Sequence, residues 1–124
     1  MYQDHSALQA AGQLLIAFAF LASGIRNLGW KFRQHLDRMA AYGVPQTRLV
    51  LITGFVLNFA GAALLALDYR RALGAGLLII FTVLASAIFH RWWLITDPLL
   101  RHLHIGNLLV NCAVVGALLL VIAI

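Results

Sequence analysis

The chain has 124 residues, of which 63% are hydrophobic and only 10% are charged. A soluble domain averages about 25% charged residues, and so short a chain could not bury this excess of apolar side chains in a globular core. The composition excludes a soluble domain and predicts a membrane protein. The formal net charge of +5 does not indicate a nucleic-acid partner, because most Lys and Arg residues lie beside the apolar segments.

Four apolar segments are long enough to cross a bilayer, which takes about 20 residues. They cover approximately residues 8–28, 49–67, 72–93 and 103–124. None of them contains Pro or an acidic residue, and none shows the strict alternation of a barrel strand. We therefore expect an all-α fold in which a single membrane domain, residues 1–124, forms a four-helix transmembrane bundle.

The connection between the first two predicted spans is too long for a simple turn. Four of its apolar residues fall on one face of a helix: Phe32, Leu36, Met39 and Tyr42. Gly43 and Pro45 follow and are typical helix terminators. This pattern predicts a short amphipathic helix that lies in the interfacial region of the membrane.

Each predicted span carries one stripe of polar or small residues at helical spacing. The stripes are Ala19, Ser23 and Asn27; Gly54, Asn58 and Gly61; Thr82, Ser86 and His90; and His104, Asn107 and Asn111. Unpaired polar groups are costly in hydrocarbon, so we expect all four stripes to face the bundle interior.

The depth of these residues predicts a ligand pocket near the charged connections. Asn27, His90, Asn107 and Asn111 lie within about two turns of that side, whereas Asn58 lies roughly 15 Å into its span. We expect Asn58 at the floor of the pocket and Trp93 or its neighbour near the mouth. The alternative is that the amides only hold the helices together through hydrogen bonds.

His90 allows more than one kind of ligand, because imidazole can bind a metal or donate a hydrogen bond to a carbonyl. A metal or haem set could combine His90 with His102 and His104, and His35 lies on the same side. We disfavour that set because no Cys or intramembrane carboxylate assists it, and the spacing of His102 and His104 points them to different faces. We favour a quinone or a lipid-like molecule, and we identify no catalytic residue.

Four stretches resemble the DoxX family of small four-span integral membrane proteins over approximately residues 13–120. They are "FLASG" in the first span, "AYGVP" before the second, "FHRWW" at the end of the third and "NCAVVGALLL" in the fourth. Family members commonly carry a Lys where this chain has Asn27 and a Glu where it has Asn58. An amide pair keeps the hydrogen bonding of that ion pair and loses its charge, so a proton-carrying role is not implied.

The resemblance implies a membrane subunit associated with quinone-linked redox chemistry. We expect an accessory subunit of a respiratory or other electron-transfer complex in the bacterial inner membrane, without activity of its own. Its partners would be the lipid bilayer and a larger membrane complex, or further copies of the chain. The alternatives are a structural or assembly protein without a ligand, and a free-standing oxidoreductase.

The distribution of basic residues predicts the orientation of the chain in the membrane. Seven Lys or Arg residues lie on one side of the four predicted spans: Arg26, Lys31, Arg33, Arg38, Arg48, Arg91 and Arg101. The other side carries two, Arg70 and Arg71. Because basic residues concentrate on the cytoplasmic side, we expect both termini outside the cytoplasm.

Cysteine labelling tests this orientation. A single cysteine at Gln3, in a chain whose Cys112 is replaced by Ala, should react with a membrane-impermeant maleimide applied from outside. A single cysteine at Gln46 should react only after the membrane is opened. Labelling of the Gln46 position from outside, without labelling of the Gln3 position, would reverse the predicted topology.

Overall fold

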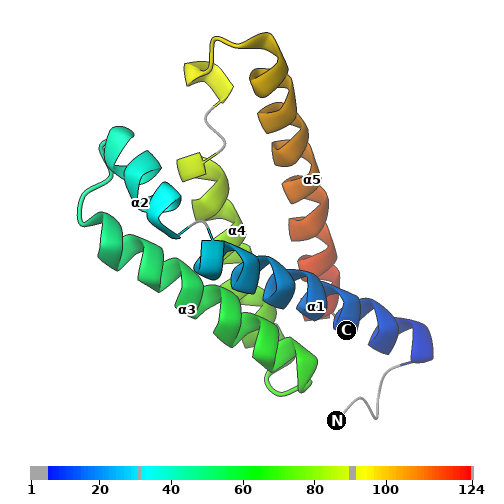
Figure 1. Ribbon diagram of the computed structural model, residues 1–124. Coiled ribbons are helices and arrows are strands. Elements are labelled where there is room, and N and C mark those ends of the chain that lie inside the picture. Colours follow the sequence, from blue (N-terminus) through cyan, green and yellow to red (C-terminus); the bar gives the residue numbers. More distant parts are fainter. Residues whose placement is uncertain (1–5, 31, 90–91, 124) are drawn as a thin grey trace.

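The computed structural model describes residues 6–30, 32–89 and 92–123, which form five α-helices and one 3-10 helix and, within those ranges, no strand (Figure 1). Four helices are long and apolar enough to span a membrane: α1 (Ala7–Trp30), α3 (Thr47–Ala66), α4 (Arg71–Phe89) and α5 (Pro98–Ala123). The short helix α2 (Phe32–Ala41) lies between the first two, and the 3-10 helix η1 (Trp92–Leu94) precedes α5. The predicted all-α bundle with a short additional helix is confirmed.

Two of the helices differ in length from the predicted spans. The third span was expected over residues 72–93, but α4 ends at Phe89 and the 3-10 turn η1 follows before the chain reverses. The fourth span was expected to begin near residue 103, but α5 begins at Pro98. The Asp97 carboxylate accepts hydrogen bonds from the Leu99 and Leu100 amides, at 2.9 and 3.3 Å, and so caps the helix. Proline suits the first helical position because its missing N–H has no helical partner there.

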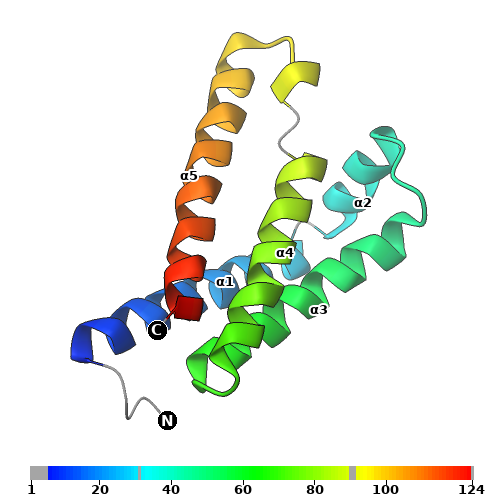
Figure 2. The same ribbon diagram turned by 180° about the vertical axis from the view of Figure 1, so that it is seen from behind.

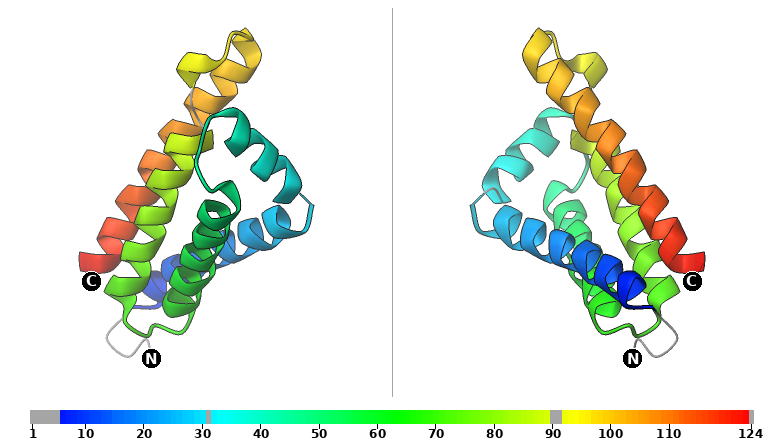
Figure 3. Two further views of the ribbon diagram at one scale, coloured as in Figure 1. Left: turned by 90° about the vertical axis from the view of Figure 1, so that its left-hand side faces the viewer. Right: turned by 90° about the vertical axis from the view of Figure 1, so that its right-hand side faces the viewer.

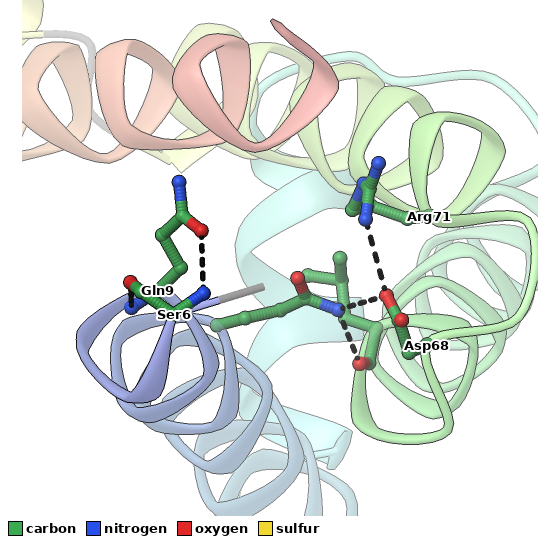
Figure 4. Close-up of polar contacts among 6 residues, drawn as sticks. Ser6, Gln9, Asp68 and Arg71 are labelled. Carbon is green, nitrogen blue, oxygen red and sulfur yellow. Dashed lines mark hydrogen bonds and ion pairs between the residues drawn. The ribbon is translucent and has the colours of Figure 1, made fainter. Parts of the chain in front are cut away.

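α1 begins with a similar local signal. The Ser6 hydroxyl accepts a hydrogen bond from the Gln9 amide at 3.1 Å, and the Gln9 side chain accepts one from the Ser6 amide at 2.8 Å (Figure 4). This reciprocal pair is a capping box, which satisfies two amides at the start of a helix. The short-range sequence therefore sets where α1 and α5 begin.

α2 is the amphipathic helix that the sequence predicts. Met39 is buried, and Phe32, Leu36 and Tyr42 are partly buried on the same face. The helix ends where Gly43 adopts a φ of 77°, with hydrogen bonds from Gly43 N to Ala40 O and from Val44 N to Met39 O. This is a Schellman ending, and it requires a residue that tolerates positive φ.

The long helices form two arms that diverge from one end of the molecule. Figure 3 shows α1 and α3 in one arm and α4 and α5 in the other, meeting at the end where the α3–α4 turn lies. The buried core sits at this closed end and consists of Ala17, Leu65, Ala75, Leu78, Leu118 and Val121. Toward the opposite end the arms separate, and α2 packs there against α1, α3 and α4.

The outward faces of the spans are apolar. Only 11% to 28% of the most apolar window of each spanning helix is buried within the protein. Large side chains such as Phe18, Val56 and Leu109 are more than half exposed. Such surfaces are stable only against lipid chains, so a bilayer surrounds this bundle.

Glycines allow α3 and α4 to pack backbone against backbone near the closed end. A Cβ atom added at Gly61 would lie 2.9 Å from the Gly74 carbonyl oxygen, and one added at Gly74 would lie 3.0 Å from the Gly61 carbonyl oxygen. Small residues at membrane helix interfaces permit this close approach. The contact joins the two arms.

A buried amide fastens α1 to the same end. The Gln13 side chain is 1% exposed, and its Nε2 donates to the Leu65 carbonyl at 2.9 Å and to Asp68 Oδ1 at 3.0 Å. The same Asp68 oxygen lies 3.5 Å from Arg71 Nη1 (Figure 4). Sequence analysis missed Gln13, although a glutamine within an apolar span is itself a signal for such a partner.

The glycine contact gives a stability prediction with a matched control in the same helix. Gly74→Ala should lower the free energy of unfolding by about 1–3 kcal/mol, because the new methyl group meets backbone atoms that cannot move aside. Gly76→Ala should leave stability unchanged or slightly raised, since nothing lies within 4 Å of a Cβ there and Ala favours helix. Thermal unfolding in detergent measures both, and equal melting temperatures would show that the close contact is absent.

Candidate functional site

A cavity of about 790 Å³ lies between the two arms, in the half of the bundle away from the closed end. All five α-helices line it. They contribute the C-terminal turns of α1 and α4, the first half of α3, and parts of α2 and α5. This is also the side on which most of the Lys and Arg residues lie. The cavity volume falls within the range of sites that hold cofactor-sized molecules.

The walls are mostly apolar and include four phenylalanines: Phe20, Phe55, Phe81 and Phe89. The rings of Phe20 and Phe81 meet edge to face, with centroids 6.2 Å apart and planes at 72°. The ring of Phe55 stacks on Phe32 of α2, with centroids 6.0 Å apart. These ring contacts connect the aromatic walls of α1 and α4 and those of α2 and α3.

His35 of α2 brings an imidazole to the cavity. It precedes the buried Met39 by one helical turn, so both side chains lie on the face that α2 turns toward the bundle. The ring packs edge to face on Phe89, with centroids 5.0 Å apart. Sequence analysis placed His35 only among possible metal ligands, but its spacing from Met39 could have indicated the inward face.

The other polar side chains of the cavity differ in the hydrogen bonds that they already form within the protein. The hydroxyls of Thr53 and Thr82 donate to carbonyls within their own helices, each at 2.8 Å. Asn27 Nδ2 lies 3.5 Å from the Ser23 hydroxyl, the outer limit of a hydrogen bond. Asn27 therefore keeps more bonding capacity for a ligand than either threonine.

Asn111 of α5 connects α5 to α4 within their shared arm. Its Nδ2 donates to the Ser86 hydroxyl at 2.8 Å, and the residue also lines the cavity. The predicted stripes of the third and fourth spans therefore do face one another at this level. Arg38 is a further polar residue that lines the cavity, and it is exposed on α2. Within the described residues, no acidic side chain lines it.

Asn58 is buried, as predicted, but it is directed toward α1. Its side chain is 1% exposed and donates from Nδ2 to the Phe20 carbonyl at 3.1 Å. Gly24 makes room for it, because a Cβ added there would overlap Asn58 Nδ2. Asn58 is not among the described residues that line the cavity, and its buried Oδ1 has no hydrogen-bond partner within the described chain. It therefore acts mainly as a contact between α1 and α3.

The remaining predicted site residues lie apart from the cavity. Asn107 and Trp93 are exposed and do not line it, so the expectation that Asn107 faces the interior is wrong. The cause is the divergence of the arms, because α1, α2 and α3 lie away from the first turns of α5 (Figure 1). His90 lies outside the described residues, and its role stays a prediction.

The alternative metal set also depends on His90. His102 is exposed and His104 is partly buried. Among the residues that the structure describes, no three His, Cys, Asp or Glu side chains gather closely enough to hold a metal ion. The described chain therefore offers hydrogen-bonding groups and aromatic walls as its chemistry.

The DoxX family model matches residues 8–91, which is more than half of the chain. The match covers α2, α3 and α4 and all of α1 except its first residue. No curated protein and no solved structure matches.

The position of Asn58 gives a prediction that separates it from Asn107. Asn58→Leu removes the bond to Phe20 and should lower the free energy of unfolding by about 1 kcal/mol, the usual scale for a hydrogen bond between membrane helices. Asn107→Leu should not destabilise the protein, because Asn107 is exposed. Chemical unfolding in mixed micelles compares the two variants, and a larger loss for Asn107→Leu would contradict the assignment.

Proposed function

We propose, because this chain belongs to the DoxX family, that it is an integral inner-membrane accessory subunit of a quinone-linked electron-transfer complex. In this proposal the cavity between the arms holds a quinone-like molecule. The observation that carries it is an aromatic-walled cavity of about 790 Å³ in which hydrogen-bonding side chains from α1, α2 and α5 converge.

The chemistry of the walls suits a flat ring with carbonyl groups. A quinone head offers two carbonyl oxygens that need donors, and an apolar ring that packs on aromatic side chains. His35 on α2 and Asn27 on α1 can each donate a hydrogen bond to such an oxygen. Phe20, Phe81 and Phe89 supply apolar ring contacts. The cavity also lacks acidic groups among its described residues, which would repel an electron-rich carbonyl.

The position of the cavity supports a ligand that arrives from the membrane. Several lining residues are exposed on the outer surface of the spans, among them Ala19, Leu49 and Leu84. The cavity therefore borders the lipid between the arms, whereas α2 covers its aqueous end. A molecule dissolved in the hydrocarbon region reaches such a site without crossing water.

The cysteine content of the chain supports the accessory role. Cys112 is the single cysteine, so no intrachain thiol pair can carry electrons. We assign electron transfer to a partner subunit and ligand placement to this chain. The family relationship supports that division of roles.

A structural or assembly protein without a ligand is the second candidate. The amides of Gln13, Asn58 and Asn111 all donate to other helices or to the α3–α4 turn. Hydrogen bonds of this kind stabilise membrane helix bundles without any ligand. They do not require a cavity, however, and His35 is not part of them.

Variants of two histidines distinguish these candidates. His35→Phe keeps an aromatic ring beside Phe89 but loses the hydrogen-bonding nitrogen atoms, and His102→Phe makes the same change at an exposed position. Binding of a short-chain benzoquinone to the purified protein should weaken roughly tenfold in His35→Phe, the scale of one lost hydrogen bond. His102→Phe should bind as the unaltered protein does.

Two further measurements bear on the same proposal. Purification from native membranes, followed by mass spectrometry, should recover a quinone and the larger partner subunits with this chain. Absence of both would favour the structural candidate. Equal quinone affinity in the two histidine variants would remove His35 from the binding site.

A further inference from the structure

Among the described residues, no helix closes the cavity between α1 and α5. Both helices line the cavity, but within the described chain α1 packs mainly on α3, and α5 packs on α4. Ala17 of α1 and Leu118 and Val121 of α5 share the core at the closed end. Beyond that core the two helices separate, as the two views in Figures 1 and 2 show.

α1 presents a smooth, apolar strip to this opening. Its members recur at helical spacing and are all exposed: Gly12, Leu15, Ala19 and Ala22. Three of the four are small, so they leave a shallow trough on the helix surface in which an extended chain can lie. Ala19 also lines the cavity, which places the strip at the border between the cavity and the lipid.

A polar hollow lies at the C-terminal end of the strip. A second cavity of about 350 Å³ is lined, within the described chain, by Ala22, Ser23, Arg26 and Asn27. It shares Ser23 and Asn27 with the larger cavity, so the two adjoin. Arg26 lies one turn before the end of α1 at Trp30, where a spanning helix reaches the headgroup layer.

The chemistry of this hollow suits a phosphate group. A guanidinium group binds a phosphate through two parallel hydrogen bonds, and a hydroxyl and an amide can supply further donors. The connection that follows α1 adds Lys31, Arg33, Arg38 and Arg48 against the one acidic residue Asp37. A basic juxtamembrane segment attracts anionic lipids.

We infer that an anionic phospholipid binds on α1, with its phosphate held by Arg26, Ser23 and Asn27 and one acyl chain lying along the strip from Ala22 to Leu15. The eleven helical steps from Leu15 to Arg26 span roughly 16 Å at 1.5 Å per residue. That length matches one leaflet of a hydrocarbon core about 30 Å thick. The lipid completes the cavity wall that α1 and α5 leave open. The site does not require that the cavity hold a quinone.

Lipid retention tests the inference. The purified protein is placed in bilayer discs of phosphatidylcholine with a small fraction of phosphatidylglycerol, and the lipid retained after mild detergent extraction is counted by native mass spectrometry. One phosphatidylglycerol should stay with each protein in preference to phosphatidylcholine. Arg26→Gln should reduce that retention about tenfold, the scale of one lost charge-assisted interaction. Arg33→Gln, which removes an exposed arginine of α2 outside both cavities, should leave it unchanged.

A second variant tests the acyl strip without altering charge. Ala22→Phe fills the trough at an exposed position and should also reduce retention, whereas Ala60→Phe, at an exposed position on α3, should not. Normal retention in Ala22→Phe would remove the acyl chain from the strip. Circular dichroism and gel filtration of each variant separate lost lipid binding from lost folding.

Other outcomes would overturn the inference. Equal retention of phosphatidylcholine would mean that the headgroup charge is not recognised. Displacement of phosphatidylglycerol by millimolar inorganic phosphate would assign the hollow to a small soluble anion. Equal losses in Arg26→Gln and Arg33→Gln would mean that the net positive charge of this side, and not the hollow on α1, attracts the lipid.

Discussion

α3 and α4 pack backbone against backbone at Gly61 and Gly74, and the positions of the other helices follow from that contact. Because it lies near one end, the helices are held together there and are free to diverge toward the other end. Gln13 fastens α1 to the same end through Leu65 and Asp68. A bundle clamped at one end and open at the other has a cavity between its arms, and α2 covers the end of that cavity that faces water.

An unpaired polar group in hydrocarbon is costly, and this cost accounts for where the polar side chains of the bundle lie. Gln13, Asn58 and Asn111 donate within the bundle and hold its helices together. Asn27 and the imidazole of His35 line the cavity, where the proposed ligand would contact them. Asn111 belongs to both groups, because it also lines the cavity.

The lipid surrounds the bundle and also lies against the opening of its larger cavity. The arms expose apolar faces along their whole length, and the larger cavity borders the bilayer where α1 and α5 separate. In the proposed function, a quinone-like ligand would enter the cavity from the hydrocarbon region, where it is already concentrated. The phospholipid proposed on α1 would form part of the wall of that cavity.

The sequence by itself determined the elements of this protein, since they depend on local chemistry. Apolar length predicted the four spans, the spacing of Phe32, Leu36 and Met39 predicted α2, and Gly43 predicted its end. Periodicity also predicted that Asn58 is buried and that Ser86 and Asn111 face the bundle interior, where they form a hydrogen bond.

Only the tertiary structure decided which polar residues share a site. Periodicity identifies the face of a helix on which a residue lies, but the tilt of the helices determines what that face meets. The arms meet at Gly61 and Gly74 and diverge beyond that contact. As a result Asn107 is exposed, whereas His35 lines the cavity. Asn58 meets α1 because Gly24 lies opposite it, a pairing between distant segments that no local pattern contains.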